Sequence, residues 1–313
     1  MNFQQLRIVR EAVQRNFNLT EVAAALFTSQ SGVSKHILDL EDELGIEVFV
    51  RKGKRLTGLT EPGKELLGIV ERMLIDAKNI KRVAEQFANR DEGSLTIATT
   101  HTQARYALPQ VVRRFKLAFP KVHLVLHQAS PAEIVALLQS GEADIGIATE
   151  ALDGGTGQAG FASFPFYDWH HVVVVPDGHA LVARAAAAPL TLQALAEQPL
   201  ITYHAGYTGR TRIDAAFAEA GLAPDVVMSA LDADVVKTYV EVGLGVGIIA
   251  SMAFDAARDA GLRRLDAAHL FPPNTTRIAV RRGHYLRGYA YRFLEECSPA
   301  LTPEVVKGAL DAD

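Results

Sequence analysis

Two short helices joined by a polar turn are predicted near the amino terminus. Asn18 is suited to cap the first helix, because its side chain can accept a backbone hydrogen bond, and residues 21–27 that follow are mostly helix formers. Small polar residues at 28–32 interrupt the pattern. Gly45 ends the second helix, at the position that favours a left-handed residue. Apolar residues spaced four, three and four apart define one face of this second helix, namely Val33, Ile37, Leu40 and Leu44.

A β-hairpin with a basic tip is predicted next. The runs 46–50 and 56–60 contain strand-forming residues, and four of the five residues from Arg51 to Arg55 are cationic, around Gly53. A helix pair followed by such a hairpin is typical of a winged helix-turn-helix, whose second helix enters the major groove of DNA. The basic tip would then contact phosphates or the minor groove. The alternative is a pair of packed surface helices and a solvated charged turn.

A single long helix is predicted over residues 62–90. Its apolar residues repeat at alternating spacings of four and three, the pattern of a coiled-coil seam: Leu66, Val70, Met73, Ala77, Ile80, Ala84 and Phe87. A helix of about 28 residues extends roughly 42 Å, more than most helices of a compact domain. We therefore expect a dimerisation linker that holds two winged helices, each formed by residues 1–61, at a fixed spacing on DNA. The alternative is a core helix of one globular unit.

Strands and helices alternate from residue 91 to the end of the chain. Strands are expected at 94–98, 122–126 and 144–148, with helices at 102–118 and 131–139 between them. The alternation continues through further elements expected at 169–175, 200–201, 212–220, 225–228, 234–241, 246–250, 276–280 and 285–296. Such alternation indicates an α/β fold with parallel sheets covered by helices.

This half of the chain, residues 91–313, is expected to form a two-lobed effector domain like that of periplasmic binding proteins. The first lobe would comprise about 91–162 and 267–300, and the second about 163–266. Two α/β lobes joined by crossing segments form a clamshell that binds a small ligand between them.

An anion site is predicted where the first strand of this half ends. Backbone N–H groups and the helix dipole favour an anion between a strand end and a helix start. Thr100, Thr102 and Gln103 add neutral donors there, which suit a fully ionised sulfate-like group. Thr149 ends another strand at the same edge, and Thr202 holds the equivalent place in the second lobe. The alternative is ordinary helix capping by Thr100 and Thr102.

Composition and charge are consistent with a cytoplasmic DNA-binding protein of several domains. The 313 residues are 49% hydrophobic and 22% charged, enough for more than one core. The net charge is −4, but residues 1–90 carry 14 Lys and Arg against 12 Asp and Glu, whereas the remainder carries 18 against 24. The chain starts without a basic and apolar signal, and its apolar runs fall short of the roughly 18 residues that cross a membrane.

Neither a metal, a cofactor nor a catalytic activity is expected. The single cysteine, Cys297, excludes an intramolecular disulfide and a cysteine-based zinc site. His170 and His171 are adjacent on an expected strand and should point to opposite faces. The glycines from Gly243 to Gly247 lack the spacing of a dinucleotide loop and lead into a strand rather than a helix. The chain also lacks a nucleophile with a recognisable base partner.

The first 63 residues resemble the DNA-binding domain of LysR-type transcriptional regulators. The resemblance rests on Leu6, Ala12, Thr20, Ala23, Ala24, Leu26, Ser29, Gln30, Val33, Ser34, Leu40, Glu41, Leu44, Gly45, Phe49, Arg51, Leu59, Thr60, Pro62 and Gly63. It implies that the second helix reads bases through Ser29, Gln30, Ser31, Ser34, Lys35 and His36. It also implies that the wing holds phosphates through Arg51, Lys52, Lys54 and Arg55.

Over nearly its whole length the chain resembles the CysB-like subgroup of that family, which regulates cysteine biosynthesis or sulfonate use. The resemblance rests on residues 99–106, 149–151, 169–171, 231–241 and 274–277. It implies that the effector is bound by Thr100, Thr102, Gln103, Thr149, Trp169 and Thr202.

The same resemblance implies the partners. They are promoter DNA, a second or a further three copies of the chain, and an effector such as sulfate, thiosulfate, O-acetylserine, N-acetylserine or adenosine phosphosulfate. A LysR-type regulator of another pathway with a different small anion, or a solute-binding module, is the alternative.

Overall fold

A computed structural model describes residues 1–53, 55–88, 91–152 and 160–311 of the chain. The chain divides into two compact units, Met1–Ala84 and Glu85–Asp313.

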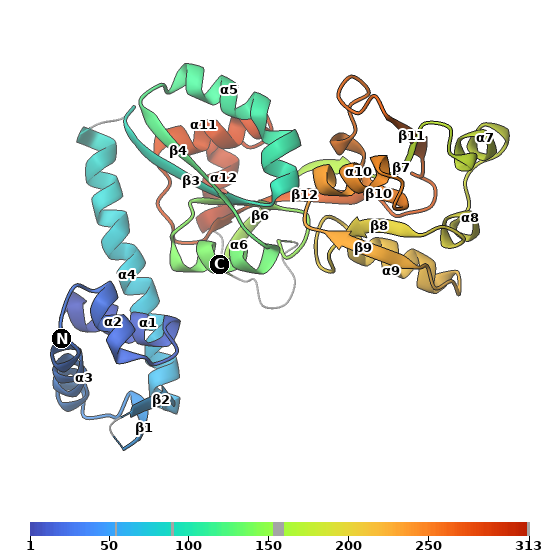
Figure 1. Cartoon of the computed structure of the whole chain (residues 1–313). Helices are drawn as coiled ribbons and strands as arrows, with labels where there is room; N and C mark the ends of the chain where they lie inside the picture. Colours follow the sequence, from blue (N-terminus) through green and yellow to red (C-terminus); the bar gives the residue numbers. More distant parts are fainter. Residues whose placement is uncertain (54, 89–90, 153–159, 312–313) are drawn as a thin grey trace. The chain divides into compact units, whose positions relative to one another are not determined.

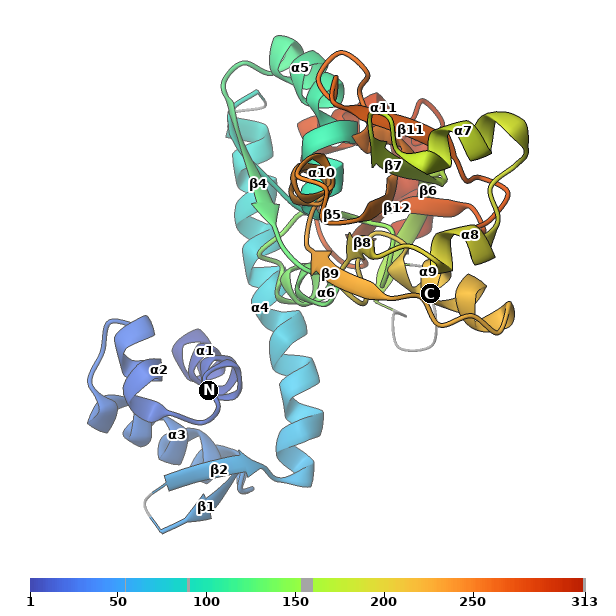
Figure 2. The ribbon, with the colours of Figure 1, turned by 45° about the vertical axis from the view of Figure 1, so that its right-hand side comes forward.

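The N-terminal unit is a winged helix-turn-helix (Figures 1 and 2). Its elements are α1 (Phe3–Gln14), α2 (Leu19–Ala25), α3 (Gln30–Leu44), β1 (Phe49–Lys52), β2 (Arg55–Leu59) and the start of α4 (Glu61–Ala88). The expected caps are present, since the Asn18 side chain accepts from the backbone N–H groups of Thr20 and Glu21. Gly45 adopts the left-handed conformation with φ 67°. The helix pair and the hairpin are therefore confirmed.

The helix predicted for 62–90 is α4, but its apolar stripe has two different environments. Val70 is 1% exposed and packs with Leu74 into the core of the N-terminal unit. In contrast, Ile80 and Phe87 are 71% and 74% exposed. The heptad pattern could not distinguish these environments, because an intramolecular core and a second chain select the same spacing of apolar residues. The interpretation of Val70 as part of a seam between subunits is therefore wrong.

The C-terminal unit contains two five-stranded sheets. The first has the strand order β4-β3-β5-β12-β6. Its strands are β3 (Gly93–Thr99), β4 (Val122–Gln128), β5 (Ile145–Ala148), β6 (Phe161–Trp169) and β12 (Asn274–Arg281). α5 (Leu108–Ala118), α11 (Gly288–Cys297) and α12 (Pro303–Asp311) pack on one face, and α6 (Pro131–Ser140) packs on the other (Figure 1).

The second sheet has the order β11-β7-β10-β8-β9. Its strands are β7 (His171–Pro176), β8 (Leu200–Tyr203), β9 (Val226–Ala230), β10 (Val246–Ala250) and β11 (Leu262–Asp266). One face is covered by α7 (Ala180–Ala187), α8 (Leu192–Ala196) and α9 (Arg210–Glu219), and the other by α10 (Ala233–Glu241). A short 3-10 helix, η2 (Ser251–Ala253), follows β10.

Both sheets are mixed rather than parallel, which corrects one expectation. β12 runs antiparallel to β5 and β6, and β7 runs antiparallel to β10 and β11. The lobe boundary expected between residues 162 and 163 is also wrong, because β6 belongs to the first sheet and the chain crosses over only after Trp169. Pro165 hid this strand from the sequence pattern, and an edge strand such as β6 tolerates a proline.

The helix predicted at 102–118 begins with an irregular turn. Residues Gln103–Ala107 form a π-helix, η1, and the regular helix α5 starts only at Leu108. Such π-turns are rare and frequently occur at functional sites. This turn directly follows the strand end at which the sequence predicts an anion site.

Candidate nucleic-acid interface and effector site

The start of α3 presents most of the predicted base-reading side chains. All six are exposed or half-buried, namely Ser29, Gln30, Ser31, Ser34, Lys35 and His36. Ser29 has a different role, because its hydroxyl accepts a hydrogen bond from the Gly32 backbone N–H at 3.1 Å. It therefore caps the helix and fixes the position from which the other side chains project.

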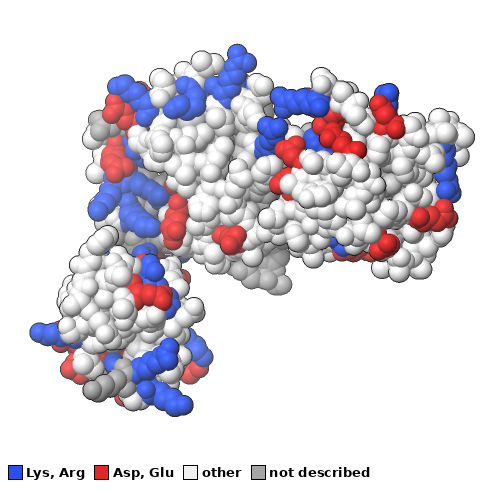
Figure 3. Space-filling model, in the orientation of Figure 1, with Lys and Arg blue, Asp and Glu red and all other residues white. Residues whose placement is uncertain are grey.

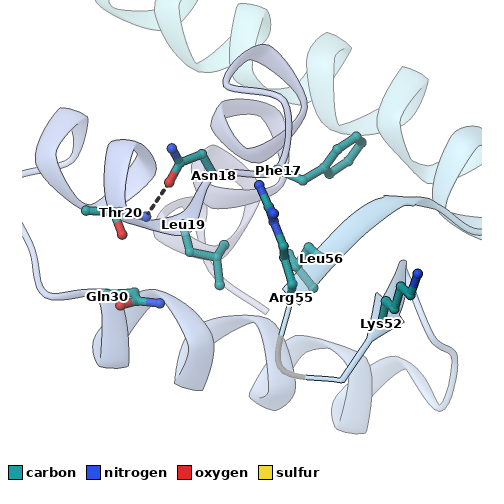
Figure 4. A pocket seen from close by; sticks show the side chains of 8 residues that line it. All are labelled: Phe17, Asn18, Leu19, Thr20, Gln30, Lys52, Arg55 and Leu56. Atoms are coloured by element: carbon teal, nitrogen blue, oxygen red, sulfur yellow. Dashed lines mark hydrogen bonds between the residues drawn. The ribbon is translucent and has the colours of Figure 1, made fainter.

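A pocket of about 420 Å³ opens between the helix pair and the wing (Figure 4). Its lining residues come from the start of α2, the start of α3 and both wing strands: Phe17, Asn18, Leu19, Thr20, Gln30, Lys52, Arg55 and Leu56. The Arg55 side chain extends from β2 towards Asn18 and Phe17 (Figure 4). The exposed cations Lys52 and Arg55, beside polar side chains of the helix pair, could bind a phosphate group of DNA. DNA contacts were predicted from the sequence for Lys52, Arg55 and Gln30, but not for the residues at the start of α2 that complete the pocket.

The wing is held against α3 by one buried carboxylate. Glu41 accepts hydrogen bonds from the backbone N–H groups of Val48 and Phe49, at 2.8 and 3.1 Å. It also pairs with Arg51, whose guanidinium lies 2.6 Å away. Arg51 was predicted to bind phosphate, but this contact shows that it also positions the hairpin. Lys54 lies outside the described residues. Figure 3 shows that Lys and Arg side chains gather around this hairpin.

The predicted effector residues lie where the strands of the first sheet end. Thr100, Thr102 and Gln103 follow β3 and are all buried. The Gln103 side-chain carbonyl accepts a hydrogen bond from the Tyr167 hydroxyl at 2.5 Å. The Thr102 hydroxyl lies 3.4 Å from that of Thr208, which belongs to the second lobe. The β3 end therefore contacts both lobes.

A threonine that the sequence analysis did not single out joins two of the other predicted residues. Thr276 on β12 accepts a hydrogen bond from the Trp169 indole N–H at 3.1 Å, and its hydroxyl lies 3.4 Å from that of Thr149. Thr202 is placed differently, because its hydroxyl donates to the Ile248 carbonyl at 3.0 Å within the second sheet. The structure thus connects Thr149 to Trp169, whereas Thr202 has its hydroxyl bonded inside its own lobe.

A second set of polar contacts joins the two lobes at Gly209. The Glu150 carboxylate, next to Thr149, accepts a hydrogen bond from the Gly209 backbone N–H. Burial raises the pKa of Glu150, although the Gly209 N–H opposes that shift. The preceding residue, Thr208, has φ 45°, a strained conformation for a β-branched residue. Strain of this kind is often found at binding sites.

The π-helix carries a further contact between the lobes. The Tyr106 hydroxyl donates to Asp234 on α10 at 2.7 Å, and Arg105 pairs with the same carboxylate at 3.2 Å. Burial, followed by the hydrogen bond to Asp234, raises the pKa of Tyr106, so that the phenol keeps its proton as a donor. Asp234 also lies 3.3 Å from Lys237, whose ammonium is buried against Asp259 at 2.9 Å.

The part of the chain that the structure describes contains no group of three or more His, Cys, Asp or Glu side chains arranged to hold a metal ion. Within the same residues, every helix is too short or too polar to span a membrane.

Comparisons with known proteins account for the full length of the chain. Residues 3–64 match the family described as "Bacterial regulatory helix-turn-helix protein, lysR family", and residues 88–302 match "LysR substrate binding domain". The chain is 59% identical over 310 residues to the transcriptional regulator SsuR of Burkholderia cenocepacia, covering 99% of both proteins. It is 51% identical over 313 residues to CysB of the same organism, covering 100% of this chain and 98% of that one.

A solved structure extends the comparison to the C-terminal unit. The crystal structure of the cofactor-binding domain of the Cbl transcriptional regulator matches with a TM-score of 0.66 and 48% sequence identity. The match covers 71% of this chain and 95% of that domain. The relatives are named as regulators of transcription, which confirms the expectation of a regulator rather than an enzyme.

Proposed function

The chain belongs to the LysR family of transcriptional regulators, and we propose that it controls sulfur-assimilation genes in response to a small anionic effector. The genes would serve cysteine biosynthesis or the use of sulfonates when sulfate is scarce. Its relatives SsuR and CysB, together with the CysB-like residues of its own sequence, support this choice of pathway. The protein would act on promoter DNA as a homodimer or homotetramer.

The burial of Thr100, Thr102 and Gln103 at one strand end is the observation that carries the effector proposal. A fully ionised small anion needs hydrogen-bond donors rather than a proton acceptor, and threonine hydroxyls and a glutamine amide provide them. The proposed site would lie at the carboxyl ends of β3 and β5, where open α/β sheets bind ligands. The contact from Thr102 to Thr208 means that an anion bound here would lie beside both lobes.

A calorimetric titration of the whole protein with sulfate, thiosulfate, O-acetylserine, N-acetylserine and adenosine phosphosulfate tests this proposal. At least one of them should bind, and Thr100→Val or Gln103→Ala should weaken that binding because each removes a donor. A hydrogen bond to a charged group contributes about 1.5–3 kcal/mol, or roughly 10- to 150-fold in affinity. Unchanged affinity in both variants would contradict the site, and a wild-type protein that binds none of the five would contradict the sulfur assignment.

The DNA-binding half of the proposal can be tested on its own. Lys52→Ala and Arg55→Ala each remove a cation that lines the pocket between the wing and the helix pair. Each phosphate contact contributes about 0.9 to the slope of log affinity against log salt. The double variant should therefore bind a DNA duplex more weakly, with a slope smaller by about 1.8, when fluorescence anisotropy is measured at several salt concentrations. The exposed Lys307→Ala removes one positive charge and is the control for each single variant; an equal loss of DNA affinity in this control would contradict the assignment.

A further inference from the structure

Polar side-chain atoms at the effector site are buried without a hydrogen-bond partner. They are His101 Nδ1, Glu150 Oε2 and Asn274 Oδ1, and they have no partner among the described residues. Asn274 is fully buried, and Glu150 lies next to the effector residue Thr149. Native proteins rarely leave such atoms unpaired, because each loses its bonds to water when it is buried. Unpaired atoms at a binding site therefore indicate what a ligand must supply.

The orientation of Asn274 follows from its neighbours. His171 Nε2 lies 3.2 Å from the Thr208 carbonyl, which can only accept, so that this nitrogen carries the proton. Burial lowers the pKa of His171 to about 4, so that the ring is neutral and its Nδ1 is an acceptor. Asn274 Nδ2, 3.5 Å from Nδ1, is the matching donor. The other end of the amide, the acceptor Oδ1, is thereby turned towards Gly209.

The position of Gly209 brings the two unpaired acceptors to one place. Its backbone N–H donates to Glu150 Oε1, whereas no hydrogen bond of normal geometry from the described residues reaches Oε2 of the same carboxylate. A β-carbon on Gly209 would lie only 2.6 Å from Asn274 Oδ1. Both side chains therefore lie against the same residue of the second lobe, and both present an oxygen that can only accept as long as Glu150 is ionised.

We infer that the effector of this protein carries a hydrogen-bond donor, a hydroxyl, amide N–H or ammonium group, which Glu150 and Asn274 receive. The inference rests on the effector site proposed above and adds a second requirement to it. Thr100, Thr102 and Gln103 hold the anionic group, and the acceptor pair holds the donor. A bare oxyanion such as sulfate has only hydrogen-bond acceptors at neutral pH. It can accept from the donors of Thr100, Thr102 and Gln103, but it offers no donor to Glu150 and Asn274. An organic anion with an N–H or O–H group satisfies both sides.

The variant Glu150→Gln tests this requirement, because it keeps the shape of the side chain but replaces an acceptor with a donor. Affinities for sulfate and for N-acetylserine, which has both an N–H and an O–H, are measured by calorimetry on the full chain. We expect wild type to prefer N-acetylserine, and the variant to reduce the ratio of the two affinities at least tenfold. The exposed Glu142→Gln is the control for loss of one negative charge from the same lobe, and should leave the ratio unchanged.

A pair of glycine variants provides an independent test if Glu150→Gln does not fold. Gly209 and Gly206 both have positive φ, of 73° and 80°, so that alanine strains the backbone at both. Only at Gly209 would the added methyl meet Asn274 Oδ1, at 2.6 Å, and the His171 ring that orients Asn274, at 2.7 Å, whereas at Gly206 nothing lies within 4 Å. Gly209→Ala should therefore lose N-acetylserine binding by at least tenfold relative to Gly206→Ala.

The outcomes separate the two proposals. An unchanged affinity ratio in Glu150→Gln, or equal effects of the two glycine variants, would overturn the donor requirement while anion binding at the threonines stands. Wild-type binding of sulfate without any binding of N-acetylserine, O-acetylserine or adenosine phosphosulfate would also overturn it. Binding of none of these ligands would overturn the sulfur proposal together with the inference drawn from it.

Discussion

Acidification should destabilise the C-terminal unit through one buried imidazole. His171 is completely buried, and burial lowers its pKa from 6.5 to about 4, with Arg212 and His170 acting in the same direction. The folded protein therefore keeps this ring neutral between pH 6.5 and 4, whereas the unfolded chain takes up a proton as the pH falls below 6.5. Because the unfolded state then binds more protons, the free energy of unfolding decreases across this window and is unaffected above it.

The size of the effect follows from the two pKa values. With 6.5 for the unfolded chain and about 4 for the folded protein, this histidine lowers the free energy of unfolding by about 2 kcal/mol between pH 7.5 and pH 5. His171→Gln should remove this contribution, because an amide does not titrate and its N–H can still donate to the Thr208 carbonyl. When the pH falls from 7.5 to 5, the variant should therefore lose about 2 kcal/mol less of its free energy of unfolding than wild type loses.

Trp169 makes the measurement specific. It is the single tryptophan of the chain, and its ring centre lies 5.0 Å from that of His171. Urea unfolding followed by tryptophan fluorescence at pH 7.5 and pH 5 thus reports on this unit. Comparison of wild type with the variant cancels the other groups that titrate, Glu150 among them. The exposed His123→Gln is the control. A difference in stability that is the same at both pH values would refute the reasoning, because it would mean that His171 is not held neutral.

Further predictions concern the other parts of the molecule. Ile80→Asp should give folded monomers in sedimentation, because it places a charge in the exposed apolar stripe of α4, and dimers of this variant would rule out a seam at this position. Val70→Asp should instead unfold the N-terminal unit, because it buries a charge in the core. Asp259→Asn should cost about 3 kcal/mol in urea unfolding, since it leaves the buried Lys237 ammonium with less compensation, and a cost below about 1 kcal/mol would contradict that account. Glu41→Ala should lower the free energy of unfolding by about 2–4 kcal/mol and weaken DNA binding, because it leaves two backbone N–H groups of the wing without their acceptor. An unchanged DNA affinity of this variant in fluorescence anisotropy would show that other contacts hold the wing.

The sequence predicts well the features that depend on neighbouring residues. Asn18 and Gly45 have the expected cap conformations because capping involves only residues within one turn. Most strands of the C-terminal unit were found where apolar runs are bounded by turns, but β11 (Leu262–Asp266) was missed because charged residues interrupt its apolar pattern. β6 was found only at its last residue, Trp169, because Pro165 interrupts the run and its position at a sheet edge is a property of the whole fold.

Only part of the candidate effector site could be predicted from the sequence. Thr100, Thr102 and Gln103 could be selected because they follow a strand, and position along the chain is enough to recognise a strand end. Thr276 and Thr208 could not be selected, because each is more than 100 positions along the chain from the predicted residue that it contacts, Trp169 and Thr102 respectively. Thr276 lies in a segment that resembles CysB-like regulators, yet the pattern alone does not say which side chain of a segment points inward.

The irregular turn after β3 brings the predicted effector residues and the lobe contacts into one short stretch, Thr102–Tyr106. Thr102 and Gln103 lie at its start, and Arg105 and Tyr106 near its end hold Asp234 of the other lobe. A π-helix is less stable than an α-helix and is retained where it places side chains that a regular turn would not. Because Gln103 and Tyr106 belong to the same turn, a ligand that moved the first would also act on the contact that the second makes. If the proposed site binds its effector, the turn would therefore link occupancy of that site to the contact between the two lobes.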